Sequence, residues 1–429
     1  MNPVNAMKRI LFGSDIGHAP DSRTYAWNLA SSIAYSAQSA LLLLVVSRFG
    51  GLEAAGRFSI YYITTTMLAS VGSYSMRNYQ VSDAKQVYSF GTYLGSRFAT
   101  SVLMMVMCLG YAAIWQPNPE GIAVVLLLGV YRATDAIEDV YHGEVQRLGR
   151  LDAASIAHAV RIVLSFVAFT VAYVVTVDLA VAAGALALSS IVLFVLTMPA
   201  FLDVYPKLAV RPLMYHVGKL LAVCLPICAA AVLYGFIANL PRYAIEAAMT
   251  AEMQGIFNIL FMPVFVVDML STVIFNPVVA DMGRYWQDGD LPALRKIVVR
   301  QVGVIAVLSV GCAVVGYLIG CPVLGFIYGA DLGEWSGLLA LLLLLGGISA
   351  LASFAVVLLT VMRRQGFILA GYIVAIGSSV LYLNPLVTNY GLVGAGCSYG
   401  ILMSVALLVF AVVAVVAAAR KGKGGESRA

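Results

Sequence analysis

The chain has 429 residues, of which 61% are hydrophobic and only 11% are charged, and its formal net charge is +5. About a quarter of the residues of soluble domains are charged, so this composition, with a mean hydropathy of +0.92, excludes a soluble protein and indicates an integral membrane protein. All six cysteines lie in or beside apolar stretches, where thiols behave as small hydrophobic groups, and we expect no disulfide bond, no metal site and no cofactor.

Twelve apolar stretches follow one another along the chain, each of about 20 residues, the length that a helix needs to cross a bilayer. They lie at 27–46, 58–76, 98–115, 121–141, 154–176, 179–201, 217–238, 255–275, 301–320, 336–360, 367–387 and 392–418. We therefore predict an all-α polytopic membrane protein with about twelve transmembrane helices.

Basic residues gather in alternate connections between these helices. All but five of the 26 lysines and arginines, with Lys85 and Arg428 among them, precede the first helix, follow an even-numbered helix or lie in the tail. Cytoplasmic loops retain basic residues, so we predict a multi-pass protein of the cell inner (plasma) membrane with both termini in the cytoplasm. This topology and anionic lipids account for the positive charge, and we expect no binding of nucleic acid.

A cytoplasmic connection divides the helices into two sets of six. We predict a cytoplasmic segment at 1–24, an N-terminal lobe at 25–202, a linker at 203–216, a C-terminal lobe at 217–418 and a tail at 419–429. Two segments that each open an even-numbered helix, LEAAGRFSI at 52–60 and AEMQGIFNI at 251–259, share glutamate, glycine, phenylalanine and isoleucine at matching positions, Gly56 with Gly255 among them. Their common orientation predicts parallel repeats around a central cavity.

Several longer stretches carry a family resemblance. They are NLASSIAYSAQSALLLLVVSRFGGLEAAGRFSI at 28–60, YSMRNYQVSD at 74–83, PRYAIEAAMTAEMQGIFNI at 241–259, FNPVVADMGRYWQDGD at 275–290, IYGADLGEW at 327–335 and YGLVGAG at 390–396. Together they resemble the polysaccharide exporter or O-antigen flippase branch of the multidrug/oligosaccharidyl-lipid/polysaccharide exporter superfamily. The resemblance implies two six-helix lobes that work by alternating access and a polyprenyl-pyrophosphate-linked oligosaccharide as the substrate.

The predicted fourth helix carries charged residues at membrane depth. At 1.5 Å per residue Arg132 lies roughly 16 Å from the outer surface, near the midplane, and offsets of three and seven place it on one helical face with Asp135, Asp139 and His142. Each charge at such depth costs about 2.5–3.5 kcal/mol, so these residues need ionic partners or water.

The predicted fifth helix offers such partners. Counted from the turn between the two helices, Arg161 lies at the depth of Asp135, and His158 lies level with Glu138 and Asp139. A purely structural network of ion pairs between the two helices is one interpretation.

In the other interpretation the charged residues contact the transported molecules. Arg132 and Arg161 would bind the pyrophosphate of the lipid carrier, since guanidinium groups bind phosphate in a bidentate manner. Asp135, Glu138 and Asp139 would bind a coupling cation or proton.

Four further residues are candidates for substrate binding. Asp268 is a lone carboxylate in the predicted eighth helix, where it needs a partner or water. Arg48, Arg57 and Arg242 lie in the outer loops, against the general pattern of basic residues. Each of the three either contacts phosphate at the exit side or extends its charge to the membrane interface while its stem stays in apolar surroundings.

Nucleotide-binding loops, catalytic clusters and long outer loops are missing from the sequence, so we do not expect an enzyme. We predict a flippase that translocates a polyprenyl-pyrophosphate-linked oligosaccharide across the bacterial inner membrane, for biosynthesis of surface polysaccharide (O-antigen of lipopolysaccharide, capsule or exopolysaccharide). The alternatives are a multidrug or cation antiporter of the same superfamily and a membrane polymerase or ligase acting on lipid-linked glycan. The expected partners of this monomer are lipid-linked oligosaccharide, membrane lipids and other polysaccharide assembly proteins.

Overall fold

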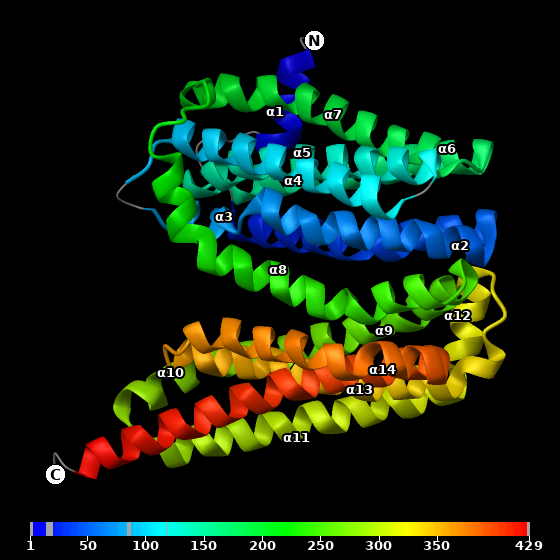
Figure 1. Ribbon diagram of the computed structural model, residues 1–429. Coiled ribbons are helices and arrows are strands. Elements are labelled where there is room, and N and C mark those ends of the chain that lie inside the picture. The colour runs from blue at the N-terminus through cyan, green and yellow to red at the C-terminus, as the bar shows by residue number, and fades with distance from the viewer. Residues whose placement is uncertain (1–2, 14–19, 84–86, 117, 427–429) are drawn as a thin grey trace. The chain divides into compact units, whose positions relative to one another are not determined.

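The computed structural model describes residues 3–13, 20–83, 87–116 and 118–426, and this part of the chain is helical almost throughout and contains no strand (Figure 1). The helices of the N-terminal half are α1 (Pro3–Phe12), α2 (Asp21–Ser73), α3 (Met76–Ser82), α4 (Phe90–Trp115), α5 (Pro119–Arg147), α6 (Leu151–Thr176) and α7 (Leu179–Val204), followed by the 3-10 turn η1 (Pro206–Leu208). Those of the C-terminal half are α8 (Val217–Ala248), α9 (Ala251–Phe275), η2 (Asn276–Val278), α10 (Val279–Asp288), α11 (Leu291–Val315), η3 (Gly316–Gly320), α12 (Cys321–Tyr328), η4 (Gly333–Trp335), α13 (Ser336–Val361) and α14 (Gly366–Glu426).

Nine helices in the described part are long and apolar enough to cross a membrane. Two of them, α2 and α14, are broken at Gly51 (φ 79°) and Gly391 (φ 57°), where glycine avoids the steric cost that a Cβ atom would bring. Each of these two helices therefore contains two successive spans. With α5, whose charged residues lower its hydropathy, the total reaches the predicted twelve, and the prediction of an all-α polytopic membrane protein is confirmed.

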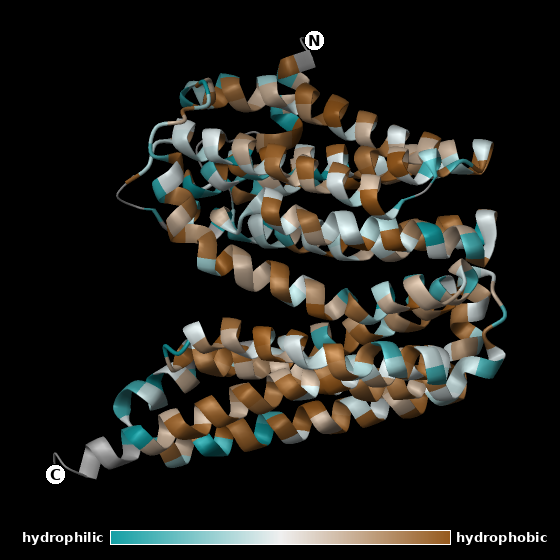
Figure 2. Cartoon of the chain, viewed as in Figure 1, coloured by the Kyte–Doolittle hydropathy of each residue, from teal (hydrophilic) through white to brown (hydrophobic). Residues whose placement is uncertain are grey.

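The distribution of hydropathy along the helices agrees with this assignment. Figure 2 shows hydrophobic residues along most of the length of the long helices, whereas hydrophilic residues concentrate at helix ends and connections. A bilayer core of about 30 Å requires such apolar lengths. The chain is therefore a multi-pass membrane protein, and the inner membrane and the cytoplasmic termini stay predictions.

The chain divides into two compact units. The first unit contains Met1–Gly50 and Phe58–Val232, and the second contains Gly51–Arg57 and Leu233–Ala429. The division falls inside α8, whereas the sequence places the linker at 203–216, a stretch that includes η1 and the non-helical residues 209–214. The predicted lobe boundaries stay a prediction. Of the predicted N-terminal segment and tail, residues 1–2, 14–19 and 427–429 lie outside the described residues, as does Lys85.

In the first unit, α1 is attached through its last carbonyl groups, which have no partner within the helix. Arg23 donates to the carbonyl oxygen of Leu11 (2.9 Å) and Arg150 donates to that of Phe12 (2.8 Å). The buried carboxylate of Asp152 pairs with both guanidinium groups, at 3.0 Å and 2.9 Å. Asp152 therefore ties the end of α1 to the starts of α2 and α6.

Replacing Asp152 by alanine should destabilise the first unit, because Arg150 is fully buried and would lose its carboxylate partner. We expect the free energy of unfolding to fall by about 1.5–3 kcal/mol, the usual contribution of hydrogen bonds to charged groups. The melting temperature of the purified protein in detergent measures the change. The control is Asp178→Ala, which removes the cap of α7 at an exposed position and should cost less stability. An equal loss of stability in both variants would contradict the prediction.

Candidate functional site

A cavity of about 320 Å³ lies beside α5 within the first unit. Its wall combines charged, hydroxyl and aromatic side chains from α2, α3, α5 and α6. The lining residues are Tyr35, Thr66, Ala69, Ser70, Ser73, Arg77, Arg132, Asp135, Ala136, Glu138, Asp139, His142 and His158. The helical face that the sequence predicts from the spacing of Arg132, Asp135, Asp139 and His142 is therefore confirmed as one continuous polar wall.

Arg161 of α6 lies behind this wall and is almost completely buried, with 1% of its surface exposed. Its guanidinium group donates to the carboxylates of Asp135 and Glu138 on α5 and to the hydroxyl of Ser190 on α7 at 2.8 Å. The predicted pairing of Asp135 with Arg161 is confirmed. Because the guanidinium already donates to two carboxylates and a hydroxyl, Arg161 fits the interpretation of a structural ion-pair network.

Asp139 is held by Arg77 and Arg97, which lie in the predicted loop between the spans 58–76 and 98–115. Arg77 of α3 donates to one carboxylate oxygen at 2.6 Å, and Arg97 of α4 donates to the other at 2.9 Å. The loop assignment of Arg97 is wrong, because α4 begins at Phe90 rather than at 98 and Arg97 is completely buried within it. Hydropathy misses this extension because Arg97 and the hydroxyl-bearing residues of the first turns lower its mean value, although Tyr93 and Leu94 are buried in an apolar cluster there.

Arg132 differs from the other arginines of the site. Its guanidinium donates to the hydroxyl of Thr66 at 2.7 Å and lies over the rings of Tyr62 and Tyr131, at 4.9 and 5.3 Å from their centroids. Among the described residues its one carboxylate contact is Asp135, at 3.9 Å. Cation–π contacts compensate a buried charge only in part, so Arg132 retains the capacity to bind an anion.

Two histidines complete the wall. The imidazole of His158 lies 2.9 Å from the hydroxyl of Ser31 and 3.5 Å from the carboxylate of Asp135. His142 lies 3.7 Å from Glu138, and the two imidazole rings are 6.1 Å apart. The sequence places His158 level with Glu138 and Asp139, but its ionic contact is with Asp135.

The remaining candidates lie outside this cavity. Arg57 pairs with Glu53, one helical turn earlier in α2, at 3.4 Å, and Arg48 is exposed. Arg242 is only 3% exposed and lies 4.4 Å above the ring of Phe261. The interpretation of Arg242 as an arginine that extends to the membrane interface is therefore wrong, because its charge is buried among aromatic rings. Asp268 belongs to the second unit, on α9.

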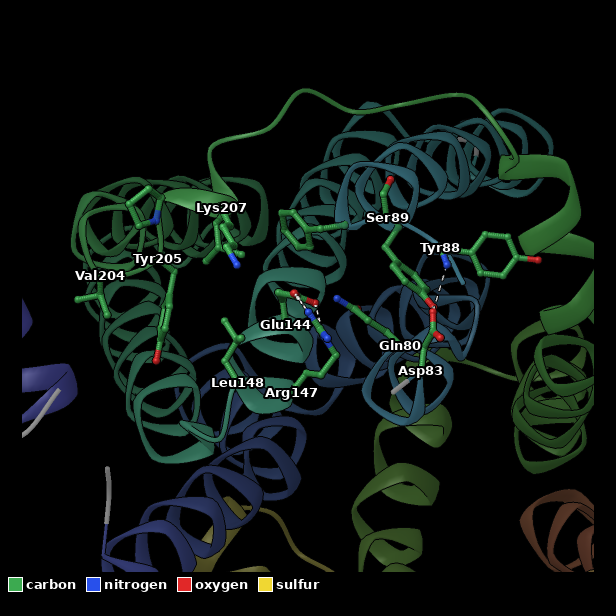
Figure 3. Close-up of a pocket in the computed structure, with 14 residues that line it drawn as sticks. Gln80, Asp83, Tyr88, Ser89, Glu144, Arg147, Leu148, Val204, Tyr205 and Lys207 are labelled. Atoms are coloured by element: carbon green, nitrogen blue, oxygen red, sulfur yellow. Dashed lines mark hydrogen bonds and ion pairs between the residues drawn. The ribbon is translucent and has the colours of Figure 1, made fainter. Parts of the chain in front are cut away.

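A second cavity of about 420 Å³ lies at the ends of α3, α4, α5 and α7 in the first unit, and the sequence analysis does not predict it. Figure 3 shows Arg147 paired with Glu144 and the backbone of Tyr88 bonded to Asp83 in its wall. Burial raises the pKa of Asp83. Hydrogen bonds from the backbone N–H groups of Val87 and Tyr88 and from the hydroxyl of Tyr93 outweigh this effect, so that the pKa lies below its ordinary value. These charges are satisfied by the wall itself, which leaves the exposed Lys207 as the accessible charge.

No protein-family model matches the sequence, and no curated protein matches it. Solved structures do match. An inward-facing multidrug resistance MATE family transporter of the MOP superfamily is 13% identical, with 92% of this chain and 99% of that chain covered and a TM-score of 0.67. A MOP superfamily transporter from Pyrococcus furiosus, described as having a binding pocket of reverse polarity, is 13% identical over 98% of both chains, with a TM-score of 0.58. The bent form of the Vibrio cholerae MATE transporter VcmN is 13% identical over 98% of this chain and 99% of that chain, with a TM-score of 0.57.

At this level of identity the likeness shows the fold alone. The chain has the fold of MATE transporters of the MOP superfamily, nearly from end to end. The three matched proteins are transporters by description rather than enzymes. Their superfamily is the one that the sequence stretches resemble, but the polysaccharide exporter branch within it is not confirmed.

Proposed function

We propose that this chain is a secondary transporter that moves an amphiphilic solute across the membrane by alternating access. The observation that carries the proposal is the cavity beside α5, where Arg132, Asp135 and Asp139 line one polar wall inside membrane-spanning helices. Ionisable groups at this depth are costly and in membrane proteins usually mark a transport pathway. The fold, shared over 92% of the chain with a multidrug resistance transporter, supports the same function.

Of the two substrate classes that the sequence predicts, the comparisons support the antiporter of organic solutes better than the flippase. The matched structure with a TM-score of 0.67 is described as a multidrug resistance transporter. In this chain, the side chains of Asp135 and Asp139 are 20% and 25% exposed, beside the ring of Tyr35. Carboxylates and an aromatic face together suit an amphiphilic organic cation.

Arg132 is the specific observation that favours the second candidate, a flippase for lipid-linked oligosaccharide. A guanidinium with hydroxyl and aromatic neighbours but only a 3.9 Å carboxylate contact suits a phosphate group, which it binds in a bidentate manner. The Pyrococcus furiosus transporter, whose binding pocket is described as having reverse polarity, supports the idea that pockets of different charge occur on this fold.

Proteoliposomes that contain the purified protein distinguish these candidates. Uptake of the fluorescent cation ethidium, driven by a proton or sodium gradient, supports the antiporter. In cells, deletion that traps lipid-linked oligosaccharide on the inner leaflet and removes glycan from the surface supports the flippase. If the proteoliposomes take up no ethidium, and deletion leaves the surface glycan unchanged in cells without a redundant exporter, both candidates are overturned.

Replacing Arg132 by alanine separates the candidates within the cavity. If the substrate carries pyrophosphate, the variant should lose export, because one bidentate contact to phosphate disappears while the fold is kept by Arg161 and its partners. If the substrate is an organic cation, ethidium uptake should persist or rise, since a positive charge leaves the wall. The matched control is Arg295→Ala, at an exposed position of α11. Loss of protein from the membrane in Arg132→Ala alone would assign this arginine to folding.

A further inference from the structure

A lone carboxylate lies inside the second unit at membrane depth. Asp268 is placed seven residues before the end of α9, about 10 Å along the helix axis. Its carboxylate accepts a hydrogen bond of 3.0 Å from the hydroxyl of Ser353 on α13, the helix that packs most closely against α9. The side chain is partly exposed, so protons can reach it.

The other polar neighbours of Asp268 are hydroxyl groups. Tyr234 of α8 interacts with Ser349 and Ser353 and is within electrostatic range of the carboxylate. Tyr372 and Tyr399 of α14 are also within that range. Tyrosine hydroxyls ionise only near pH 10, so at neutral pH all of these groups are uncharged. They can donate to an ionised carboxylate or accept from a protonated one.

In the described part of the second unit, no lysine, arginine or histidine lies within ion-pair distance of Asp268. Arg242, the buried cation of α8, bonds to Asn239 and stacks on Phe261 instead. Two further helices that contact α9, α11 and α12, contribute no counter-charge among their described residues either. The basic residues of α11 lie at its exposed start, and α12 has no charged residue. A charged carboxylate in such surroundings is costly unless it takes up a proton or a cation.

The carboxylates of the first unit are different in this respect. Asp135 and Glu138 contact Arg161, and Asp139 contacts both Arg77 and Arg97. Each of these carboxylates contacts at least one guanidinium, which cannot give up its proton, and Asp135 and Glu138 share that of Arg161. Protonation of Asp139 would leave the fully buried guanidinium of Arg97 without its carboxylate partner, at a cost of several kcal/mol.

We propose that Asp268 binds and releases the coupling proton of this transporter, an inference that rests on the proposed transport function. Protonation removes the uncompensated charge and lets the carboxyl group donate to Ser353, whereas the ionised form accepts from Ser353. The two forms therefore favour different arrangements of α9 and α13. We therefore propose Asp268 for ion coupling, in place of Asp135, Glu138 and Asp139.

Proton binding can be tested without any substrate. Infrared difference spectra of the full-length protein in lipid, recorded while the pH is lowered, should show the carbonyl stretch of a carboxyl group that becomes protonated. The band should disappear in Asp268→Asn and remain in the control Asp331→Asn, which changes an exposed loop carboxylate. A band that persists in Asp268→Asn, or that is lost in Asp135→Asn instead, would overturn the proposal.

Coupling is tested with ethidium as the probe in proteoliposomes. Asp268→Asn should lose uptake driven by a pH gradient and keep exchange of ethidium in the absence of a gradient, and Asp268→Glu should retain both. Uptake in the wild type that responds to sodium alone would overturn proton coupling. A wild type that moves no ethidium counts against the proposed antiporter, while the infrared experiment still decides whether Asp268 takes up a proton.

Discussion

Replacing Arg161 by alanine should lower the free energy of unfolding by about 3–5 kcal/mol, the usual cost of removing one partner from a buried ion pair. The guanidinium contacts Asp135 and Glu138, and Glu138 is itself 1% exposed. Without Arg161 the carboxylate of Glu138 must remain charged without a guanidinium partner or take up a proton. Both outcomes weaken the contact between α5 and α6.

The thermal unfolding of purified protein in detergent measures this loss. Arg284→Ala is the matched control, because Arg284 forms an exposed pair with Asp281 at 3.0 Å, and such pairs contribute about 0–1 kcal/mol. In the double variant Arg161→Ala, Glu138→Ala the loss should be smaller than the sum of the two single losses, since both remove the same pair. Additive losses would show that the ion pair is not the source of the stability.

Replacing Gly56 by valine should prevent the close approach of two helix starts in the second unit. A Cβ atom at residue 56 would overlap the carbonyl oxygen of Ala251, and one at residue 255 would overlap that of Leu52. Backbone atoms cannot move aside as a flexible side chain can. Since small residues let helices approach closely in membranes, we expect Gly56→Val and Gly255→Val each to abolish transport and to reduce the amount of folded protein.

The control for this pair is Gly303→Val. Gly303 lies on an exposed face of α11 with no atom within 4 Å of the place where a Cβ atom would be, so valine there should be tolerated. Size-exclusion profiles in detergent and uptake assays compare the three variants. Normal folding and transport in Gly56→Val would show that the crossing is not tight.

Gly56 and Gly255, which match in the sequence repeat, are in contact in the structure. In the sequence they are only equivalent positions of a repeat, at 52–60 and 251–259. In the structure the two glycines face each other at one crossing, with the ideal Cβ position of Gly56 lying 3.0 Å from the backbone nitrogen of Gly255. No sequence pattern distinguishes a pair that is equivalent from a pair that is also in contact, because contact depends on how the segments fold back on each other.

The limits of depth counting appear at Asp139. Counting residues from a shared turn correctly pairs Asp135 with Arg161, because α5 and α6 are consecutive and antiparallel. Asp139 instead meets Arg77 and Arg97, from α3 and α4. Their partnership depends on which helices are neighbours in the unit, and this information is absent from any single turn.

The sequence by itself determined that this is a polytopic membrane protein with about twelve spans, and roughly where most of them lie. The physical reason is that the bilayer imposes a length and a polarity on each segment separately, and a helix has a fixed rise per residue. Only the tertiary structure decided which way each charged side chain faces and what it meets. Packing surrounds Arg161 with two carboxylates, encloses Arg242 among aromatic rings and leaves Asp268 without a cation among the described residues.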